Sequence, residues 1–152
     1  MNLCQEWQAM WTKKSKDELM EMYITGIDFA IKNDWPSCEY LKKNFNRVIH
    51  RHGVYVDDRI SIRNKRQVVC NGKTHGEAYY DGYSVGALYL RHDSDVTIYV
   101  KDFAYVTIEV YDRSKVTIIN NGERTVHVFR YGGTVENEGG KVSIRDRRLP
   151  TE

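Results

Sequence analysis

A ten-residue repeat between Gly76 and Val135 constrains the fold of this chain more than any other feature. Six consecutive segments align as GEAYYDGYSV, GALYLRHDSD, VTIYVKDFAY, VTIEVYDRSK, VTIINNGERT and VHVFRYGGTV. Apolar residues recur at the first, third and fifth positions, and Asp or Gly recurs at the seventh. Such alternation is typical of a strand with one buried face, and Asp or Gly after it indicates a turn. A strand-turn unit at a fixed period predicts a parallel β-solenoid, in which each coil stacks on the next.

The spacing of charges predicts how many residues make one coil. Ten residues cannot travel out and back around a core, so a coil must hold two or three repeats. Strands of successive coils lie about 4.8 Å apart, so facing side chains interact. A spacing of ten would set Arg91 against Lys101, whereas a spacing of twenty brings opposite charges together in the pairs Asp81–Lys101, Asp93–Arg113 and Asp95–Lys115. We therefore expect about 20 residues per coil, with Val96 stacked on Val116 and Val106 stacked on Val126.

Before the solenoid the apolar period changes from two to about 3.6, which predicts an α-helical head over residues 1–55 and a solenoid over 56–152. Ser15 and Glu18 form a capping box before a helix expected over about 16–32. A second helix, capped by Ser37 or Asp34, is expected to end at Gly53, and Trp7 with Trp11 suggests a short first helix. Since solenoid ends expose strand edges, we expect the head to cap the first coil and the charged tail from Arg145 to Pro150 to blunt the last.

Composition narrows the class of protein. The 152 residues are 41% hydrophobic and 29% charged, which is typical of a soluble globular protein. No apolar stretch is long enough to cross a membrane, and residues 1–11 lack the features of a signal peptide, so a cytoplasmic location without membrane association is expected. The odd set Cys4, Cys38 and Cys70 has no CxxC pair and indicates reduced thiols. Neither a metal nor another cofactor is expected, and His50-x-His52 is interpreted as positive charge at a helix end.

The carboxylates do not predict a catalytic site. Asp102 and Asp112 fall in the turn column, where Asp adopts the same local geometry as Gly. Asp93 and Asp95 have basic partners in the twenty-residue coil. A general acid and base need two carboxylates held together in a cleft, and a solenoid this short leaves little room for the loops that build one. No catalytic residue is therefore assigned, and a carbohydrate-binding or carbohydrate-cleaving β-helix remains a further alternative.

Outward-facing aromatic residues give the leading functional prediction. In a two-wall coil, Tyr79, Tyr99 and Ile119 lie on one wall. The other wall carries the candidate partner-binding residues Tyr89, Arg91, Tyr111, Phe129 and Tyr131. Exposed aromatic residues beside Arg are typical of interface hot spots. The alternative is that tyrosine simply suits a half-exposed strand.

The runner-up prediction is nucleic-acid binding by the helical head. Residues 42–66 hold eight basic and two acidic residues, a net charge of +6, and the second helix carries Lys42, Lys43, Arg47 and Arg51. Basic residues alone would give salt-sensitive affinity without sequence preference. A solvated helix face explains the same charges.

The repeats from about 76 to 135 resemble small parallel β-helix proteins. The stretches MYITGIDFAIKND, PSCEYLKK and HRHGVYVDD, with the VTI repeats, are similar to uncharacterised proteins of gut bacteria and their phages. This second resemblance implies no activity, but favours an accessory protein of a phage or mobile element. From this resemblance and the exposed aromatic residues, we expect a non-enzymatic interaction protein that binds a protein partner or itself.

Overall fold

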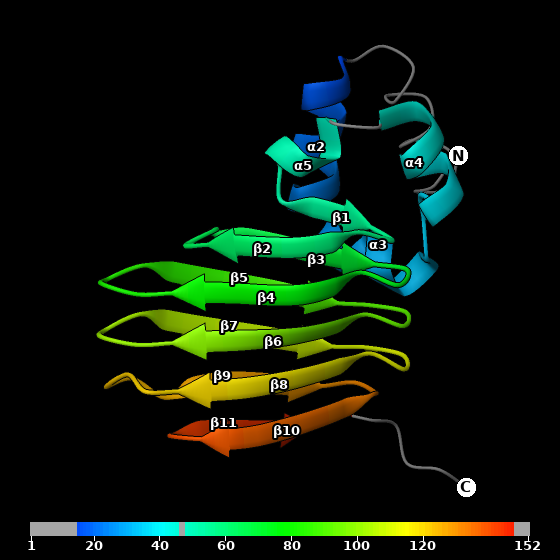
Figure 1. The fold of residues 1–152 in the computed structure, drawn as a ribbon. Coiled ribbons are helices and arrows are strands. Elements are labelled where there is room, and N and C mark those ends of the chain that lie inside the picture. The colour runs from blue at the N-terminus through cyan, green and yellow to red at the C-terminus, as the bar shows by residue number, and fades with distance from the viewer. Residues whose placement is uncertain (1–14, 46–47, 148–152) are drawn as a thin grey trace, which may run out of the picture. The chain divides into compact units, whose positions relative to one another are not determined.

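The computed structural model describes residues 15–45 and 48–147. The chain divides into two compact units, residues 1–52 and residues 53–152, which are described one at a time. The first unit is helical and the second is built from strands (Figure 1).

The helical unit contains four described helices: α2 (Lys16–Thr25), α3 (Ile27–Asn33), α4 (Cys38–Phe45) and α5 (Val48–Arg51). The predicted N-cap is confirmed, because the Glu18 N–H donates to Ser15 Oγ at 3.2 Å. The Glu18 carboxylate accepts from the Ser15 hydroxyl at 3.1 Å, which is a bond between side chains and not the expected bond to a backbone N–H. The single helix expected over 16–32 is wrong, since it is interrupted at Gly26, a residue with low helix propensity. The helix expected around Trp7 and Trp11 lies outside the described residues.

Ser37 caps the next helix, as expected, because the Tyr40 N–H donates to Ser37 Oγ at 3.2 Å. Leu41, Phe45 and Ile49 are buried along α4 and α5, which bears out the predicted apolar face at these positions. Tyr40, the other large apolar residue of α4, is exposed.

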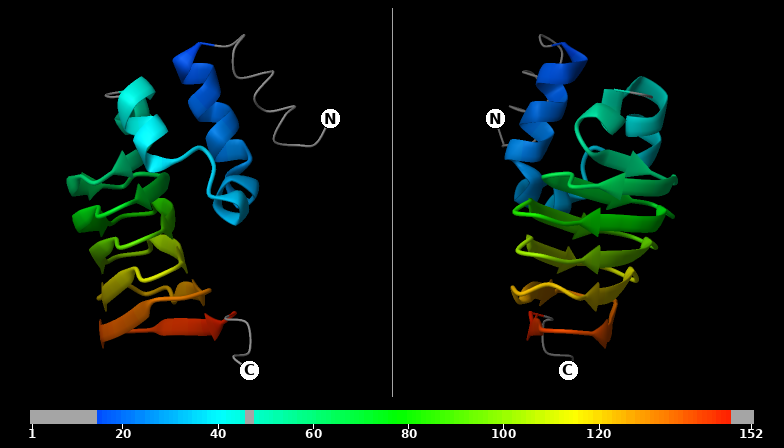
Figure 2. Two further views of the ribbon diagram at one scale, coloured as in Figure 1. Left: turned by 90° about the vertical axis from the view of Figure 1, so that its right-hand side faces the viewer. Right: turned by 60° about the vertical axis from the view of Figure 1, so that its left-hand side comes forward.

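The strand unit is a parallel β-solenoid with two sheets, which confirms the predicted fold class. Its strands are β1 (Val54–Val56), β2 (Arg59–Arg63), β3 (Gln67–Asn71), β4 (His75–Tyr80), β5 (Val85–Leu90), β6 (Asp95–Val100), β7 (Tyr105–Val110), β8 (Lys115–Asn120), β9 (Val126–Arg130), β10 (Thr134–Gly139) and β11 (Val142–Asp146). Sheet A has the order β1-β3-β5-β7-β9-β11, and sheet B has the order β10-β8-β6-β4-β2. Consecutive strands alternate between the sheets, so the chain winds around one core (Figure 2).

The register of the middle coils is twenty residues. Val96 pairs with Val116 in sheet B, as predicted, and Thr107 pairs with His127 in sheet A. The shift is shorter at the ends: Arg59 pairs with His75, and Val142 pairs with Val126. The twenty-residue shift therefore holds among the strands from β3 to β9.

The core lies between the sheets and consists of the inward residues of each strand. Val96, Ile98 and Val100 of β6 are buried, and the same alternation recurs in β7 and β8. Gly86 occupies a position where later repeats have Val, because a Cβ there would lie 2.4 Å from the Tyr80 ring. The buried Tyr80 side chain therefore replaces the missing branched residue, and its hydroxyl donates to the Lys65 carbonyl at 2.8 Å.

Candidate binding surface on sheet A

The outer face of sheet A, called here the sheet A wall, carries most of the predicted partner-binding residues. Tyr89, Glu109, Phe129 and Arg145 pair in register across β5, β7, β9 and β11. The next row, just beyond the strand ends, contains Tyr111 and Tyr131. The twenty-residue coil therefore brings four of the five predicted residues to one face, as their spacing suggested.

Tyr111 and Tyr131 form a parallel stack. Their ring centroids are 4.8 Å apart and the ring planes differ by 3°. The Tyr111 hydroxyl donates to Glu109 Oε1 at 3.2 Å, which fixes the orientation of the ring. Tyr131 is 42% exposed, so this rigid pair presents one aromatic face to the surroundings.

Phe129 lies beneath two guanidinium groups that the sequence did not point to. The Arg145 and Arg147 Cζ atoms lie 5.9 and 6.0 Å from the centroid of the Phe129 ring, within the range of cation–π attraction. A shallow groove of about 370 Å³ runs over this row and is lined by Thr107, Glu109, Phe129, Tyr131 and Arg147. The groove combines an aromatic floor with groups of both charges.

Arg91 is a correction to the predicted surface. The side chain is only 2% exposed, and its Nη1 donates to Asn71 Oδ1 at 2.9 Å. Asn71 lies one coil earlier and is itself buried, so it supplies the polar partner that a buried guanidinium needs. Arg91 therefore does not belong to the exposed face.

The sheet A wall is wider than the sequence indicated. Val85 and Tyr105 pair at the start of β5 and β7, and both are exposed. In the preceding turns, Tyr83 and Phe103 stack with centroids 5.2 Å apart, and Tyr83 is 79% exposed. None of these four residues is among the partner-binding residues that the sequence predicts. The twenty-residue spacing of Tyr83 and Phe103 was the available signal.

The opposite wall, on sheet B, contains Tyr79, Tyr99 and Ile119 in register, as predicted. Tyr79 and Tyr99 stack with centroids 4.9 Å apart. The Tyr79 hydroxyl donates to Glu77, and this hydrogen bond raises the pKa of Tyr79 above its ordinary value. The two walls therefore carry similar stacked tyrosine pairs. The two guanidinium groups over Phe129, from Arg145 and Arg147, lie on the sheet A wall.

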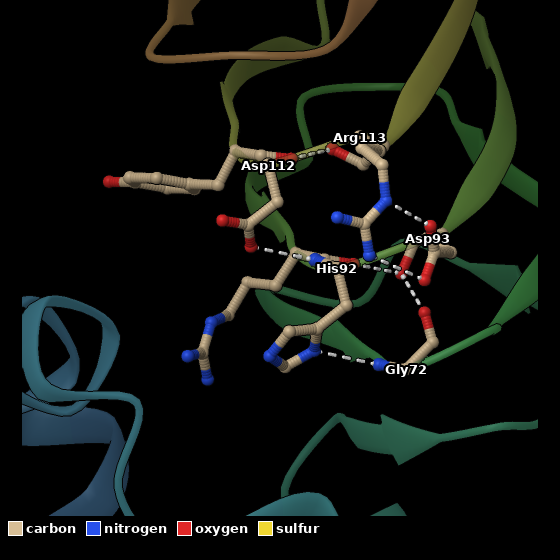
Figure 3. A network of polar contacts seen from close by, with 9 residues as sticks. Gly72, His92, Asp93, Asp112 and Arg113 are labelled. Atoms are coloured by element: carbon tan, nitrogen blue, oxygen red, sulfur yellow. Dashed lines mark hydrogen bonds and ion pairs between the residues drawn. The ribbon is translucent and has the colours of Figure 1, made fainter.

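The carboxylates of the turns hold the coils together. Asp112 and Asp102 adopt positive φ, as expected for the turn column, and accept backbone N–H groups from His92 and Gly82 at 2.9 Å. His92 repeats the arrangement, since its Nδ1 accepts from the Gly72 N–H at 2.9 Å (Figure 3). Each of these turns is thus tied to the equivalent turn one coil before it.

The charge pairs that predicted the coil length form only in part. Arg113 Nε donates to Asp93 Oδ1 at 2.8 Å, and this contact holds the pKa of Asp93 below its ordinary value (Figure 3). Asp95 does face Lys115 in register, yet Lys115 Nζ lies 3.4 Å from Glu136 Oε1. Asp81 pairs with Arg63 at 3.4 Å rather than with the expected Lys101.

The alternative nucleic-acid surface is only partly described. Lys42 and Lys43 are exposed on α4, and Arg47 lies outside the described residues. Arg51 Nη2 lies 3.2 Å from Asp17 Oδ1, and His52 Nε2 lies 2.9 Å from the same oxygen. The His52 hydrogen bond is the main cause that lowers the pKa of Asp17. Lys42, Lys43 and Arg51, three of the four predicted cations, are therefore exposed, although Arg51 also pairs with Asp17.

Three further findings concern the cysteines, membrane-spanning helices and metal ligands. Cys38 and Cys70 are free thiols, and burial raises the pKa of Cys70 to about 12. No described helix combines the length and the apolar character needed to cross a bilayer. Within residues 15–45 and 48–147, no three His, Cys, Asp or Glu side chains are grouped to hold a metal ion.

Comparison with known proteins gives no match to a family model, to a curated protein or to a solved structure.

Proposed function

We propose that this chain is a non-enzymatic interaction protein that binds a protein partner through the sheet A wall. The observation that carries the proposal is the row of Phe129 with Arg145 and Arg147 beside the stacked Tyr111 and Tyr131. Aromatic and Arg side chains dominate the binding energy of protein interfaces, because they bury large areas while keeping directional contacts.

The rigidity of the row supports the same function. The Tyr111 ring is held by Tyr131 and by Glu109, so ordering it on binding costs little conformational entropy. The groove above Phe129 can receive an apolar or aromatic side chain of a partner, while Glu109 and Arg147 lie at its sides to pair with polar groups. Asp102 and Asp112 accept backbone N–H groups in turns, and Asp93 pairs with Arg113, so these carboxylates have structural roles, which favours binding over catalysis.

The test replaces both tyrosines of the stack by serine. We expect Tyr111→Ser/Tyr131→Ser to weaken partner binding about tenfold or more, because two hot-spot rings are lost. The matched control is Tyr79→Ser/Tyr99→Ser, which removes an equivalent stacked pair and an equivalent Tyr–Glu hydrogen bond from sheet B. Thermal unfolding of both variants checks that the fold is retained.

The measurement is capture from host lysate, followed by titration of the purified candidate partner against all three proteins. A partner that binds the wild type and the sheet B variant, but not the sheet A variant, supports the proposal. Equal binding of all three proteins, or equal loss in both variants, contradicts it. A gel-shift series at low salt with Lys42→Glu/Lys43→Glu beside the wild type tests the nucleic-acid alternative.

A further inference from the structure

Within residues 53–147, β10 and β11 each have one edge that no other strand pairs with. β11 is the edge strand of sheet A and β10 is the edge strand of sheet B. Their residues are mostly exposed, including Ile144, which occupies an inward position of the pleat but is 48% exposed. Val135 and Val142 are only partly buried against the core. The core is therefore incompletely covered at this end, and open edges of this kind recruit further strands.

The two edges differ in the sign of their charge. β10 carries Glu136 and Glu138, whereas β11 and the residue after it carry Arg145 and Arg147. Asp146 of β11 lies 3.9 Å from Arg130, and Glu136 of β10 lies 3.4 Å from Lys115, so each edge strand has one side chain paired with the neighbouring coil. Charges and the bulge of β10 at Asn137 and Gly139 blunt an edge toward chance partners. Because acidic residues lie on the edge of sheet B and basic residues on the edge of sheet A, we expect a partner that presents a basic edge to β10 and an acidic edge to β11.

A second copy of the chain has that arrangement. We propose that two copies dock end to end through their last coils, with β10 of each copy pairing antiparallel with β11 of the other. Consecutive strands run in opposite directions around the coil (Figure 1), so a two-fold axis parallel to the strands brings β10 against β11 of the second copy. In that pairing the acidic edge of β10 faces the basic edge of β11 in both of the seams between the two copies.

The other end-to-end arrangement places like charges together. A two-fold axis perpendicular to the sheets would pair β10 with β10 and β11 with β11, setting Glu136 against a second Glu136 edge. Like charges directly opposite one another destabilise paired strands, while opposite charges stabilise them. Charge therefore selects the pairing that exchanges the sheets and closes at two copies.

The size of the contact predicts a weak dimer. Each seam joins strands of five or six residues, about 18 Å long, and the end of the coil buries less than a standard protein interface. We expect association in the micromolar range or weaker, and a decrease in affinity when salt screens the charges.

The experiment measures mass by sedimentation velocity from micromolar to millimolar concentration. The wild type is expected to rise from one chain of 17.8 kDa toward the mass of two. Glu136→Lys alone and Arg145→Glu alone should each weaken the dimer about tenfold, because attraction becomes repulsion in both seams. The double variant Glu136→Lys/Arg145→Glu should regain wild-type association, since each seam again joins opposite charges.

Several results would overturn the inference. The wild type could stay monomeric at millimolar concentration, or a single variant could dimerise as strongly as the wild type. The double variant could also dimerise no more strongly than the single variants. A mass that climbs beyond two chains contradicts the closed pair. If Tyr111→Ser/Tyr131→Ser abolishes the dimer and Glu136→Lys does not, self-association belongs to the sheet A wall instead. Glu136→Lys leaves the proposed partner-binding row unchanged, because Glu136 is exposed on sheet B. Arg145→Glu removes one guanidinium group from Phe129, so only Glu136→Lys separates the dimer from partner binding.

Discussion

The middle coils and the last coil have similar strands but different burial. The inward residues of β7 are buried, namely Val106, Ile108 and Val110. Of the inward residues of β11, Val142 is half-buried and Ile144 is exposed. β7 lies between β5 and β9, but β11 has only β9 as a neighbour in sheet A. Inward side chains are therefore fully buried in this fold where a coil has another coil on each side. The alternation of apolar and polar residues within a strand does not bury them by itself.

The two regions also turn differently. The middle turns place Gly82, His92, Asp102 or Asp112 at positive φ and preserve the twenty-residue shift. The last coil is reached through Gly133 and Gly140, and its strands shift by other amounts. The register of the strands therefore changes where the residues of the turns change.

The largest expected difference between the regions is in the core. Ile108→Ala should lower the free energy of unfolding by about 2–5 kcal/mol, because it leaves a cavity between two well-packed coils. Ile144→Ala removes the same atoms from an exposed position and should cost less than about 1 kcal/mol. Urea unfolding of both variants, with the monomer checked by dilution, measures the difference. Equal costs would mean that the last coil is packed as tightly as the middle.

For glycine substitutions, we expect the larger loss of stability in the last coil and the smaller loss in a middle turn. Gly133→Ala, at the entry to the last coil, places a Cβ 2.1 Å from the Ser114 carbonyl oxygen and should cost about 3 kcal/mol. Gly82→Ala, in a middle turn, has a similar positive φ with no atom within 4 Å of the added Cβ. It should cost only the conformational penalty of about 1–2 kcal/mol. Thermal unfolding compares the variants, and a Gly82 variant as unstable as the Gly133 variant would argue against crowding at Gly133.

The smallest effect is the exposed ion pair between middle coils. Arg113 lowers the pKa of Asp93, so the pair stabilises the fold above the unfolded pKa of Asp93, and this contribution is lost as pH falls through the folded pKa. Asp93→Asn should therefore cause a small loss of stability at neutral pH and none in acid. Unfolding in urea across this pH range tests the direction. A deficit that stays constant at acid pH would assign the loss to packing, and added salt should reduce an electrostatic one.

Much of the middle of the solenoid could be predicted from the sequence because its interactions recur at a fixed spacing. Val96 on Val116 and Asp93 on Arg113 are contacts between equivalent positions, so the repeat alone locates them. The same spacing brings together Tyr111 and Tyr131 of the sheet A wall.

What could not be predicted depends on places where the repeat fails. Arg145 and Arg147 reach Phe129 only because β11 is shifted by sixteen residues against β9. Arg91 occupies a position that resembles an outward one, yet it is buried and donates to Asn71 one coil earlier. The break at Gly26 follows from a local preference that the helical period conceals.

The twenty-residue shift has a consequence for how such a chain can change its length. Insertion of a whole coil would extend the sheet A wall by about 4.8 Å and leave every later side chain on its own face. Insertion of a single ten-residue repeat would instead move all later strands to the opposite sheet. Tyr111 and Tyr131 would then leave the face of Tyr89, although each repeat would remain intact. Duplications in this gene should therefore be tolerated in even numbers of repeats, with wall length growing in discrete steps.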